Sequence, residues 1–90
     1  RSQDPKVSYV ASLFDKGLEK IQKKVNEESL EAILAAEQDD QQALVSEVAD
    51  LWFHTIVLLA YKGASVNDVM QELERRFGVS GIEEKASRPQ

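Results

Sequence analysis

Two short segments of the sequence each carry a pair of acidic residues three positions apart. The first pair is Glu28 with Glu31, and the second is Glu47 with Asp50. Residues three apart lie on the same face of an α-helix, so each pair projects in one direction if its segment is helical. Carboxylates arranged in this way are the groups from which proteins build sites for hard cations.

The residues between the two pairs indicate how the pairs meet in space. Gln38-Asp39-Asp40-Gln41 is polar and predicts a turn between two helices. Position 39 lies midway between Glu28 and Asp50, and also midway between Glu31 and Glu47. In an antiparallel hairpin that turns there, Glu28 is level with Asp50 and Glu31 is level with Glu47. Because neighbouring helix axes are about 8–10 Å apart, we expect the four carboxylates to share one small volume.

Four acids in one cluster need a counter-charge. Two like charges about 4 Å apart repel by roughly 4 kcal/mol at an effective dielectric constant near 20. The groups therefore either take up protons or surround a cation, and oxygen ligands favour a hard ion such as Mg²⁺, Mn²⁺ or Ca²⁺. A di-iron bundle would need Glu-x-x-His motifs, whereas His54, the one histidine, lies four residues after Asp50. We expect His54 to be a helix residue with a satisfied hydrogen bond, and the alternative is a role beside the metal or the substrate.

Lysines crowd the segment that precedes the acidic cluster. They are Lys16, Lys20, Lys23 and Lys24, of which Lys20 and Lys24 fall on one helix face. Cations beside a metal-filled carboxylate site suit a polyphosphate substrate, because the metal bridges phosphate oxygens and the lysines neutralise the remaining charge. The alternative is a solvated basic face whose lysines pair with nearby glutamates.

The pattern of the whole chain is all-α. With few glycines and prolines and long stripes of period 3.6, the sequence indicates helices throughout. The capping signals are Ser8 for the first helix, Asp39 or Asp40 for the third, and Ser65 with Asp68 for the fourth. The expected helices span about residues 9–16, 18–37, 41–62 and 66–77, with a loose arm at 1–7 and a polar tail at 78–90.

The third of these helices is apolar on almost every side. A stripe from Leu44 to Leu58 predicts a core-facing surface, which Trp52 and Phe53 widen. In the fourth helix, the face that contains Met70 is expected to be buried. A monomer of 90 residues has few helices to cover so much apolar surface. We therefore expect a homo-oligomer with a four-helix-bundle core, most simply a homodimer and otherwise a tetramer.

Composition limits the function classes further. The chain has no cysteine and a formal net charge of −5. This predicts a single domain at residues 1–90 without zinc–thiolate sites, and it argues against nucleic-acid binding. Neither a signal peptide nor a membrane span is expected, because the apolar run at 56–60 is too short to cross a bilayer. A cytoplasmic location fits this composition.

Several of these motifs together resemble a known family. Glu27-Glu28-x-x-Glu31 followed by Glu47-x-x-Asp50 is similar to the EExxE…ExxD signature of the MazG-like, all-α nucleotide pyrophosphohydrolases. More narrowly, residues 8–88 resemble the phosphoribosyl-ATP pyrophosphohydrolase family of histidine biosynthesis. The segments that carry this second resemblance are Ser8-Tyr9-Val10, Gly17, Lys23-Lys24-Val25-x-Glu27-Glu28, Glu47-Val48-Ala49-Asp50-Leu51, His54 and Ser80-Gly81-Ile82-Glu83-Glu84-Lys85-Ala86-Ser87-Arg88.

The resemblance implies hydrolysis of phosphoribosyl-ATP to phosphoribosyl-AMP and pyrophosphate, with Mg²⁺ or with Mn²⁺ in its place. The metal ligands that it implies are Glu28, Glu31, Glu47 and Asp50. Glu27 would lie outside the metal ligands and orient water, and either Glu27 or Glu31 would accept the proton of the attacking water. The residues implied to hold phosphates are Lys20, Lys24, Lys85 and Arg88. The spacing is compatible with one metal ion or with two.

Two rival functions remain open at this stage. The nearer is a housekeeping pyrophosphohydrolase that acts on ordinary or damaged nucleoside triphosphates, since it would share the carboxylate signature. The other is a non-enzymatic helical oligomer in which the acids set the register or bind a cation. Measuring pyrophosphate release from several substrates, with and without Mg²⁺, distinguishes the three.

Overall fold

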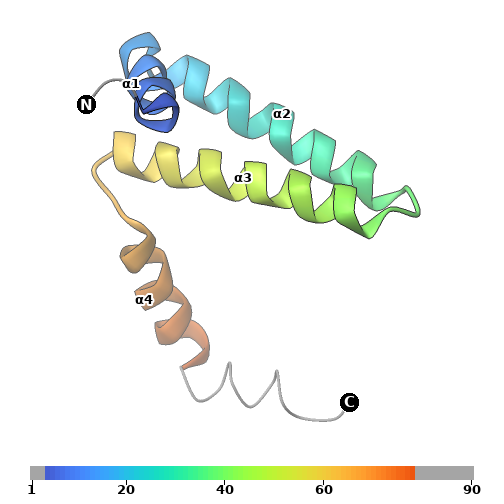
Figure 1. The fold of residues 1–90 in the computed structure, drawn as a ribbon. Helices are drawn as coiled ribbons and strands as arrows, with labels where there is room; N and C mark the ends of the chain where they lie inside the picture. Colours follow the sequence, from blue (N-terminus) through green and yellow to red (C-terminus); the bar gives the residue numbers. More distant parts are fainter. Residues whose placement is uncertain (1–3, 79–90) are drawn as a thin grey trace.

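The computed structural model describes residues 4–78, and this part of the chain forms four α-helices. They are α1 at Pro5–Lys16, α2 at Leu18–Ala36, α3 at Gln41–Tyr61 and α4 at Val66–Phe77. α2 and α3 form an antiparallel hairpin, α1 lies across its open end, and α4 leads away from it (Figure 1). The all-α fold class is confirmed, and the last three helices have the expected boundaries to within one residue.

The start of α1 differs from the expectation. The helix begins at Pro5 rather than after Ser8, and its N-cap is Asp4. The Asp4 side chain accepts a hydrogen bond from the backbone N–H of Lys6 at 2.9 Å. Proline suits the first position of a helix because its fixed φ is already helical and its missing N–H would be unpaired there anyway. Residues 5–7 are therefore helical rather than a loose arm, and residues 1–3 lie outside the described part of the chain.

The other boundary signals are confirmed. Gly17 separates α1 from α2 with a φ of 95°, a backbone conformation that favours glycine. Asp40, the second of the two candidate aspartates, caps α3 by accepting a hydrogen bond from the backbone N–H of Ala43 at 3.1 Å. Ser65 and Asp68 form the expected capping box at the start of α4, in which each side chain accepts a hydrogen bond from the other residue's backbone N–H.

The core lies where α1 meets the open end of the hairpin. Leu13 of α1, Ile21 of α2 and Val57 of α3 are buried against one another. Leu13 and Ile21 are almost fully buried, and burial of such a side chain contributes about 1.5–3 kcal/mol of hydrophobic free energy. The residues packed around these three are Val10, Phe53, Leu58 and Tyr61. This small core holds α1 against both helices of the hairpin.

The helix face of α3 that is buried differs from the expected one, which runs from Leu44 to Leu58. The structure buries His54 and Val57, on the stripe that also carries the acidic pair, whereas Leu44 and Val48 are only half-buried. Trp52 is 67% exposed and does not belong to the core. The expectation fails because α2 covers only one side of a helix that is apolar nearly all round, and the side that carries the acids is the covered one.

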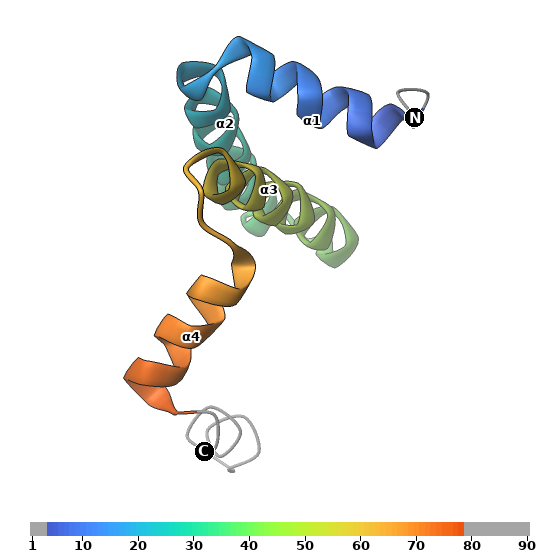
Figure 2. The ribbon, with the colours of Figure 1, turned by 90° about the vertical axis from the view of Figure 1, so that its left-hand side faces the viewer.

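α4 extends away from the hairpin (Figure 2). Its apolar residues Val66, Val69 and Met70 are exposed, so the expectation that this face is buried is wrong for the single chain. With Trp52 and Ile56 of α3, they line an apolar groove between the two helices. The single chain therefore leaves an extended apolar surface in contact with solvent.

By length and composition alone, α3 is apolar enough to cross a membrane, which the short run at 56–60 did not lead us to expect. Core helices of soluble proteins pass the same test. α3 also carries Glu47 and Asp50, whose carboxylates lie close to that of Glu28 on α2. Length and composition are therefore weak evidence for a span here.

Candidate metal and phosphate site

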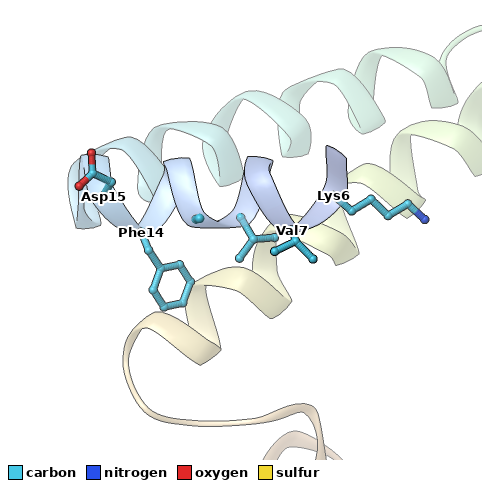
Figure 3. A pocket seen from close by; sticks show the side chains of 6 residues that line it. Lys6, Val7, Phe14 and Asp15 are labelled. Carbon is cyan, nitrogen blue, oxygen red and sulfur yellow. The ribbon is translucent and has the colours of Figure 1, made fainter. Parts of the chain in front are cut away.

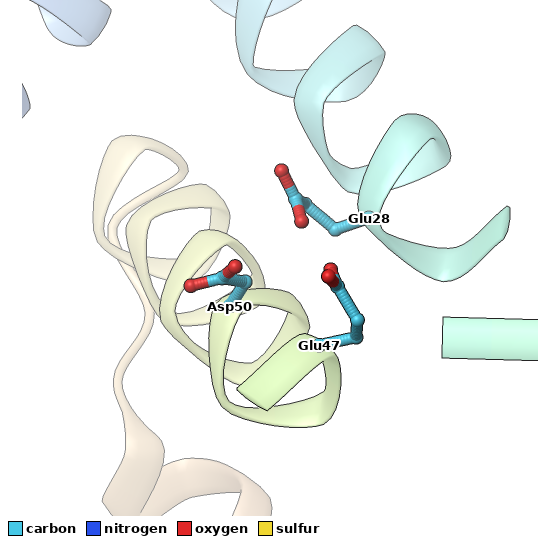
Figure 4. A group of neighbouring side chains, drawn as sticks. All are labelled: Glu28, Glu47 and Asp50. Carbon is cyan, nitrogen blue, oxygen red and sulfur yellow. The ribbon is translucent and has the colours of Figure 1, made fainter. Parts of the chain in front are cut away.

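Three of the four predicted carboxylates meet between α2 and α3. Glu28 of α2 lies opposite Glu47 and Asp50 of α3 (Figure 4). One carboxylate oxygen from each residue lies within 4.8 Å of those from the other two. Glu28 is buried, with 6% of its surface exposed, whereas Glu47 is half-buried and Asp50 is exposed. The cluster therefore has a buried inner part and a rim that faces solvent at Asp50.

The packing of α2 explains why an acid is buried. Glu28 lies on the same helix face as Ile21, Ala32 and Ala35, all of which are buried. Burial of this stripe carries the carboxylate of Glu28 inward with it, and the two small alanines allow the helices to approach closely. A charged group in such a position is unfavourable unless a partner offsets its desolvation.

Two carboxylate oxygens of the cluster are buried and unpartnered. Glu28 Oε1 and Glu47 Oε1 receive no hydrogen bond from any group in residues 4–78. An unsatisfied buried polar atom costs about 1–3 kcal/mol, and a charged one costs more. Lys24 Nζ lies 3.5 Å from the other oxygen of Glu28, but one positive charge does not balance three negative ones. A divalent cation fits both the charge of this cluster and its hard oxygen donors.

Lys24 connects the cluster to the row of lysines on α2. Its Nζ lies 3.6 Å from Glu27 Oε1, in addition to its contact with Glu28. Partial burial by itself lowers the pKa of Lys24, but Tyr9, Glu28 and Glu27 together raise it by more, so the net pKa lies above its ordinary value. Lys24 is therefore fully charged at neutral pH, at the edge of the acidic cluster.

His54 is buried on α3, one turn after Asp50. Its Nδ1 lies 2.9 Å from the backbone oxygen of Asp50, and because a carbonyl oxygen only accepts, Nδ1 carries a proton. Nε2 lies 2.7 Å from the Tyr9 hydroxyl, and the two groups share a hydrogen bond. The expected satisfied histidine is confirmed. Sequence reasoning missed Tyr9 as its partner, because no local pattern relates residues 45 positions apart.

The remaining predicted site residues lie around this cluster or outside the described residues. Glu31 is exposed and is not one of the three acids whose oxygens converge. Glu28 itself lies close to both acids of α3. The antiparallel register predicted from the sequence had instead placed Glu31 opposite Glu47. Glu27 is half-buried beside Lys24, and Lys20 is half-buried on the preceding turn of α2. The two predicted phosphate-binding residues that lie outside the described part of the chain are Lys85 and Arg88.

A sequence model of the family described as phosphoribosyl-ATP pyrophosphohydrolase matches residues 1–77, which is most of the chain. The chain belongs to the phosphoribosyl-ATP pyrophosphohydrolase family. The resemblance drawn from the sequence motifs is therefore confirmed. Both segments that supply the converging acids, Glu28 on α2 and Glu47 with Asp50 on α3, lie within the part that matches the phosphoribosyl-ATP pyrophosphohydrolase family.

Individual relatives agree with the family match. The chain is 57% identical over 88 residues to a protein of Chromobacterium violaceum, covering 98% of this chain and 82% of the relative. It is 52% identical over 92 residues to a protein of Hydrogenovibrio crunogenus, covering 98% and 81%. A protein of Methylococcus capsulatus is 52% identical over 88 residues, covering 98% and 84%. All three relatives are named phosphoribosyl-ATP pyrophosphatase.

Proposed function

We propose that this chain hydrolyses phosphoribosyl-ATP to phosphoribosyl-AMP and pyrophosphate, the second step of histidine biosynthesis. The observation that carries the proposal is the convergence of Glu28, Glu47 and Asp50, with two buried oxygens unpartnered, in a chain of this family. Relatives that share more than half of their aligned residues with it are named for this activity. Cleavage of a phosphoric anhydride uses a hard cation and neighbouring positive groups, and the residues at this site suit both.

Glu28, Glu47 and Asp50 are proposed to hold Mg²⁺, or Mn²⁺ in its place, with Glu31 on the next turn of α2 as a further ligand. When bound, the ion polarises the phosphoryl oxygens and lowers the pKa of water. The contribution of the chain is to bring the carboxylates together beforehand. At the 4.8 Å limit, two of them repel by about 3.5 kcal/mol at an effective dielectric constant of 20. A divalent cation relieves this repulsion, which favours binding.

Side chains at the rim are proposed to complete the reaction site. Glu27 or Glu31 is positioned to accept the proton of the attacking water, because each lies on the same helix as Glu28 and retains access to solvent. The raised pKa of Lys24 keeps a positive charge beside the cluster. The residues proposed to hold the phosphate chain are Lys20, Lys24, Lys85 and Arg88.

We further propose that the working form is a homodimer, or a tetramer, in the cytoplasm, without a nucleic-acid or membrane partner. The groove between α3 and α4 exposes Trp52 and Met70. A second apolar hollow on α1 is lined by Val7 and Phe14, with Lys6 and Asp15 at its ends (Figure 3). Extended exposed apolar surfaces mark association sites on soluble proteins. A second copy of the chain would supply the cover that the single chain lacks.

A substrate panel measured with and without Mg²⁺ tests the proposed function. Pyrophosphate release from phosphoribosyl-ATP is compared with release from dUTP and dCTP at equal concentrations. Faster, Mg²⁺-dependent turnover of phosphoribosyl-ATP supports the proposal. Faster turnover of a simple triphosphate would instead favour a housekeeping pyrophosphohydrolase. If no substrate releases pyrophosphate in a metal-dependent way, the proposed catalytic site is wrong and the interpretation as a non-enzymatic helical oligomer is favoured.

A further inference from the structure

A part-buried polar contact joins α1 to α3 one turn away from Asp50. The Tyr9 hydroxyl and His54 Nε2 are 2.7 Å apart, and His54 Nδ1 is 2.9 Å from the Asp50 backbone oxygen. The rings of Tyr9 and Phe53 both meet the imidazole edge-on, with centroids 5.8 Å and 5.2 Å away. The His54 ring is therefore held at both nitrogens and packed against two aromatic rings.

This arrangement does not suit proton transfer by His54. The Nδ1 proton is directed at a backbone carbonyl, which does not take it up, and Nε2 is occupied by the Tyr9 hydroxyl. The ring is also buried, with 6% of its residue surface exposed. What His54 can affect is geometry, because the Asp50 carbonyl is also the acceptor for the backbone N–H four residues later in an α-helix. The ring therefore reinforces the turn of α3 that presents Asp50.

Tyr9 lies on α1, whereas Glu28, Glu47 and Asp50 all lie on α2 and α3. Its hydroxyl therefore joins α1 to the helix that carries two of the three acids.

We propose that Tyr9 and His54 are positioning residues for the carboxylate cluster. The Tyr9 hydroxyl fixes the His54 ring, and the ring holds the turn of α3 that brings Asp50 toward Glu28 and Glu47. The inference rests on the proposed function only in requiring that this cluster bind a divalent cation. It predicts that a hydroxyl on α1, which is not a metal ligand, sets part of the metal affinity.

Tyr9→Phe tests the inference, because it removes the hydroxyl and keeps the ring that packs on Phe53. The matched control is Tyr61→Phe. Tyr61 lies at the same contact between α1 and α3, where its ring meets that of Phe14, and within residues 4–78 its hydroxyl makes no hydrogen bond. The dissociation constant for Mn²⁺ is measured by calorimetry, well below the melting temperature of every variant. Tyr9→Phe should raise the Mn²⁺ dissociation constant about two- to tenfold, which corresponds to the free energy of a single neutral hydrogen bond. Tyr61→Phe should leave the dissociation constant unchanged.

A second variant tests whether Tyr9 acts through His54. His54→Asn keeps a nitrogen donor near the place of Nδ1 and removes the hydrogen-bonding partner of the Tyr9 hydroxyl. It should weaken Mn²⁺ binding to a similar extent, and adding Tyr9→Phe to it should weaken binding no further, because both changes remove one bond. If His54→Asn does not fold, the comparison of Tyr9→Phe with Tyr61→Phe decides by itself.

The possible outcomes separate positioning from simple structural support. Lower melting temperatures with an unchanged Mn²⁺ dissociation constant would overturn the inference, as would additive effects in the double variant. If the wild-type chain binds Mn²⁺ and hydrolyses phosphoribosyl-ATP while Tyr9→Phe matches Tyr61→Phe, only the positioning role fails. If the wild-type chain binds no Mn²⁺, both this inference and the proposed metal site are wrong.

Discussion

Replacing Glu28 with glutamine removes one negative charge from the buried part of the carboxylate cluster and keeps the shape of the side chain. In the structure, one Glu28 oxygen has no partner and the other contacts Lys24 at 3.5 Å. The substitution therefore relieves repulsion with Glu47 and Asp50 and loses one contact with Lys24. It also removes one of the proposed metal ligands, so stability and activity should change in opposite directions.

The stability change can be bounded from the geometry. At the 4.8 Å limit, Glu28 repels each of its two acidic neighbours by about 3.5 kcal/mol at an effective dielectric constant of 20. Solvent at Asp50 and the lost contact with Lys24 reduce this gain, and we expect a net stabilisation of about 1–2 kcal/mol in metal-free buffer. Since 1 kcal/mol shifts the melting temperature of a domain of this size by roughly 4–8 °C, Glu28→Gln should melt about 4–16 °C higher than the wild type in EDTA.

Added Mg²⁺ should reverse the order of stability. An ion present at 100 times its dissociation constant stabilises the folded wild type by about 2.7 kcal/mol, whereas Glu28→Gln should gain much less. Turnover should fall by at least about 10²–10³-fold, because several kcal/mol of transition-state stabilisation depend on the bound ion. Melting is followed by circular dichroism at equal protein concentrations, and turnover is followed as pyrophosphate release from phosphoribosyl-ATP.

Glu19→Gln is the matched control, since Glu19 is an exposed glutamate in the first turn of the same helix. It makes the same change of charge and shape away from the cluster, so its melting temperature in EDTA and its turnover should stay close to those of the wild type. The reasoning is refuted if Glu28→Gln keeps wild-type Mg²⁺-dependent turnover. It is equally refuted if Glu28→Gln melts well below both the wild type and Glu19→Gln in EDTA.

Four further predictions test other parts of the structure. Asp50→Asn should abolish turnover, as Glu28→Gln does, but should raise the melting temperature less because Asp50 is exposed. A large fall in the melting temperature of Asp50→Asn in EDTA would contradict this. Lys24→Gln should raise the KM for phosphoribosyl-ATP about tenfold or more, as expected for a lost charged contact, and an unchanged KM would exclude a phosphate-binding role. Ser65→Ala should destabilise α4 by about 1 kcal/mol, seen as faster amide hydrogen exchange confined to that helix. Trp52→Asp should weaken self-association in analytical ultracentrifugation, and an unchanged sedimentation profile would show that the groove between α3 and α4 is not the contact between copies.

Much of the fold was predictable because it depends on local spacing. Gly17, Asp40 and Ser65 mark helix boundaries through interactions within a few residues, which the sequence displays directly. The burial of Glu28 followed from its place in an apolar stripe of period 3.6, and its approach to Asp50 followed from the position of the turn. The start of α1 differs from the expectation because Asp4 and Ser8 are about equally good capping residues, and Pro5 directly after Asp4 adds a second signal for a helix start.

The sequence by itself thus determined which helices form and that acids of α2 and α3 approach one another within the hairpin. The tertiary structure alone decided which side of α3 is covered, because a helix that is apolar nearly all round does not specify its own partner. It left Trp52 exposed, buried His54, and placed Glu31 outside the converging acids. It also brought the Tyr9 hydroxyl to His54, since a contact across 45 residues depends on how α1 crosses the hairpin and leaves no periodic pattern in the chain.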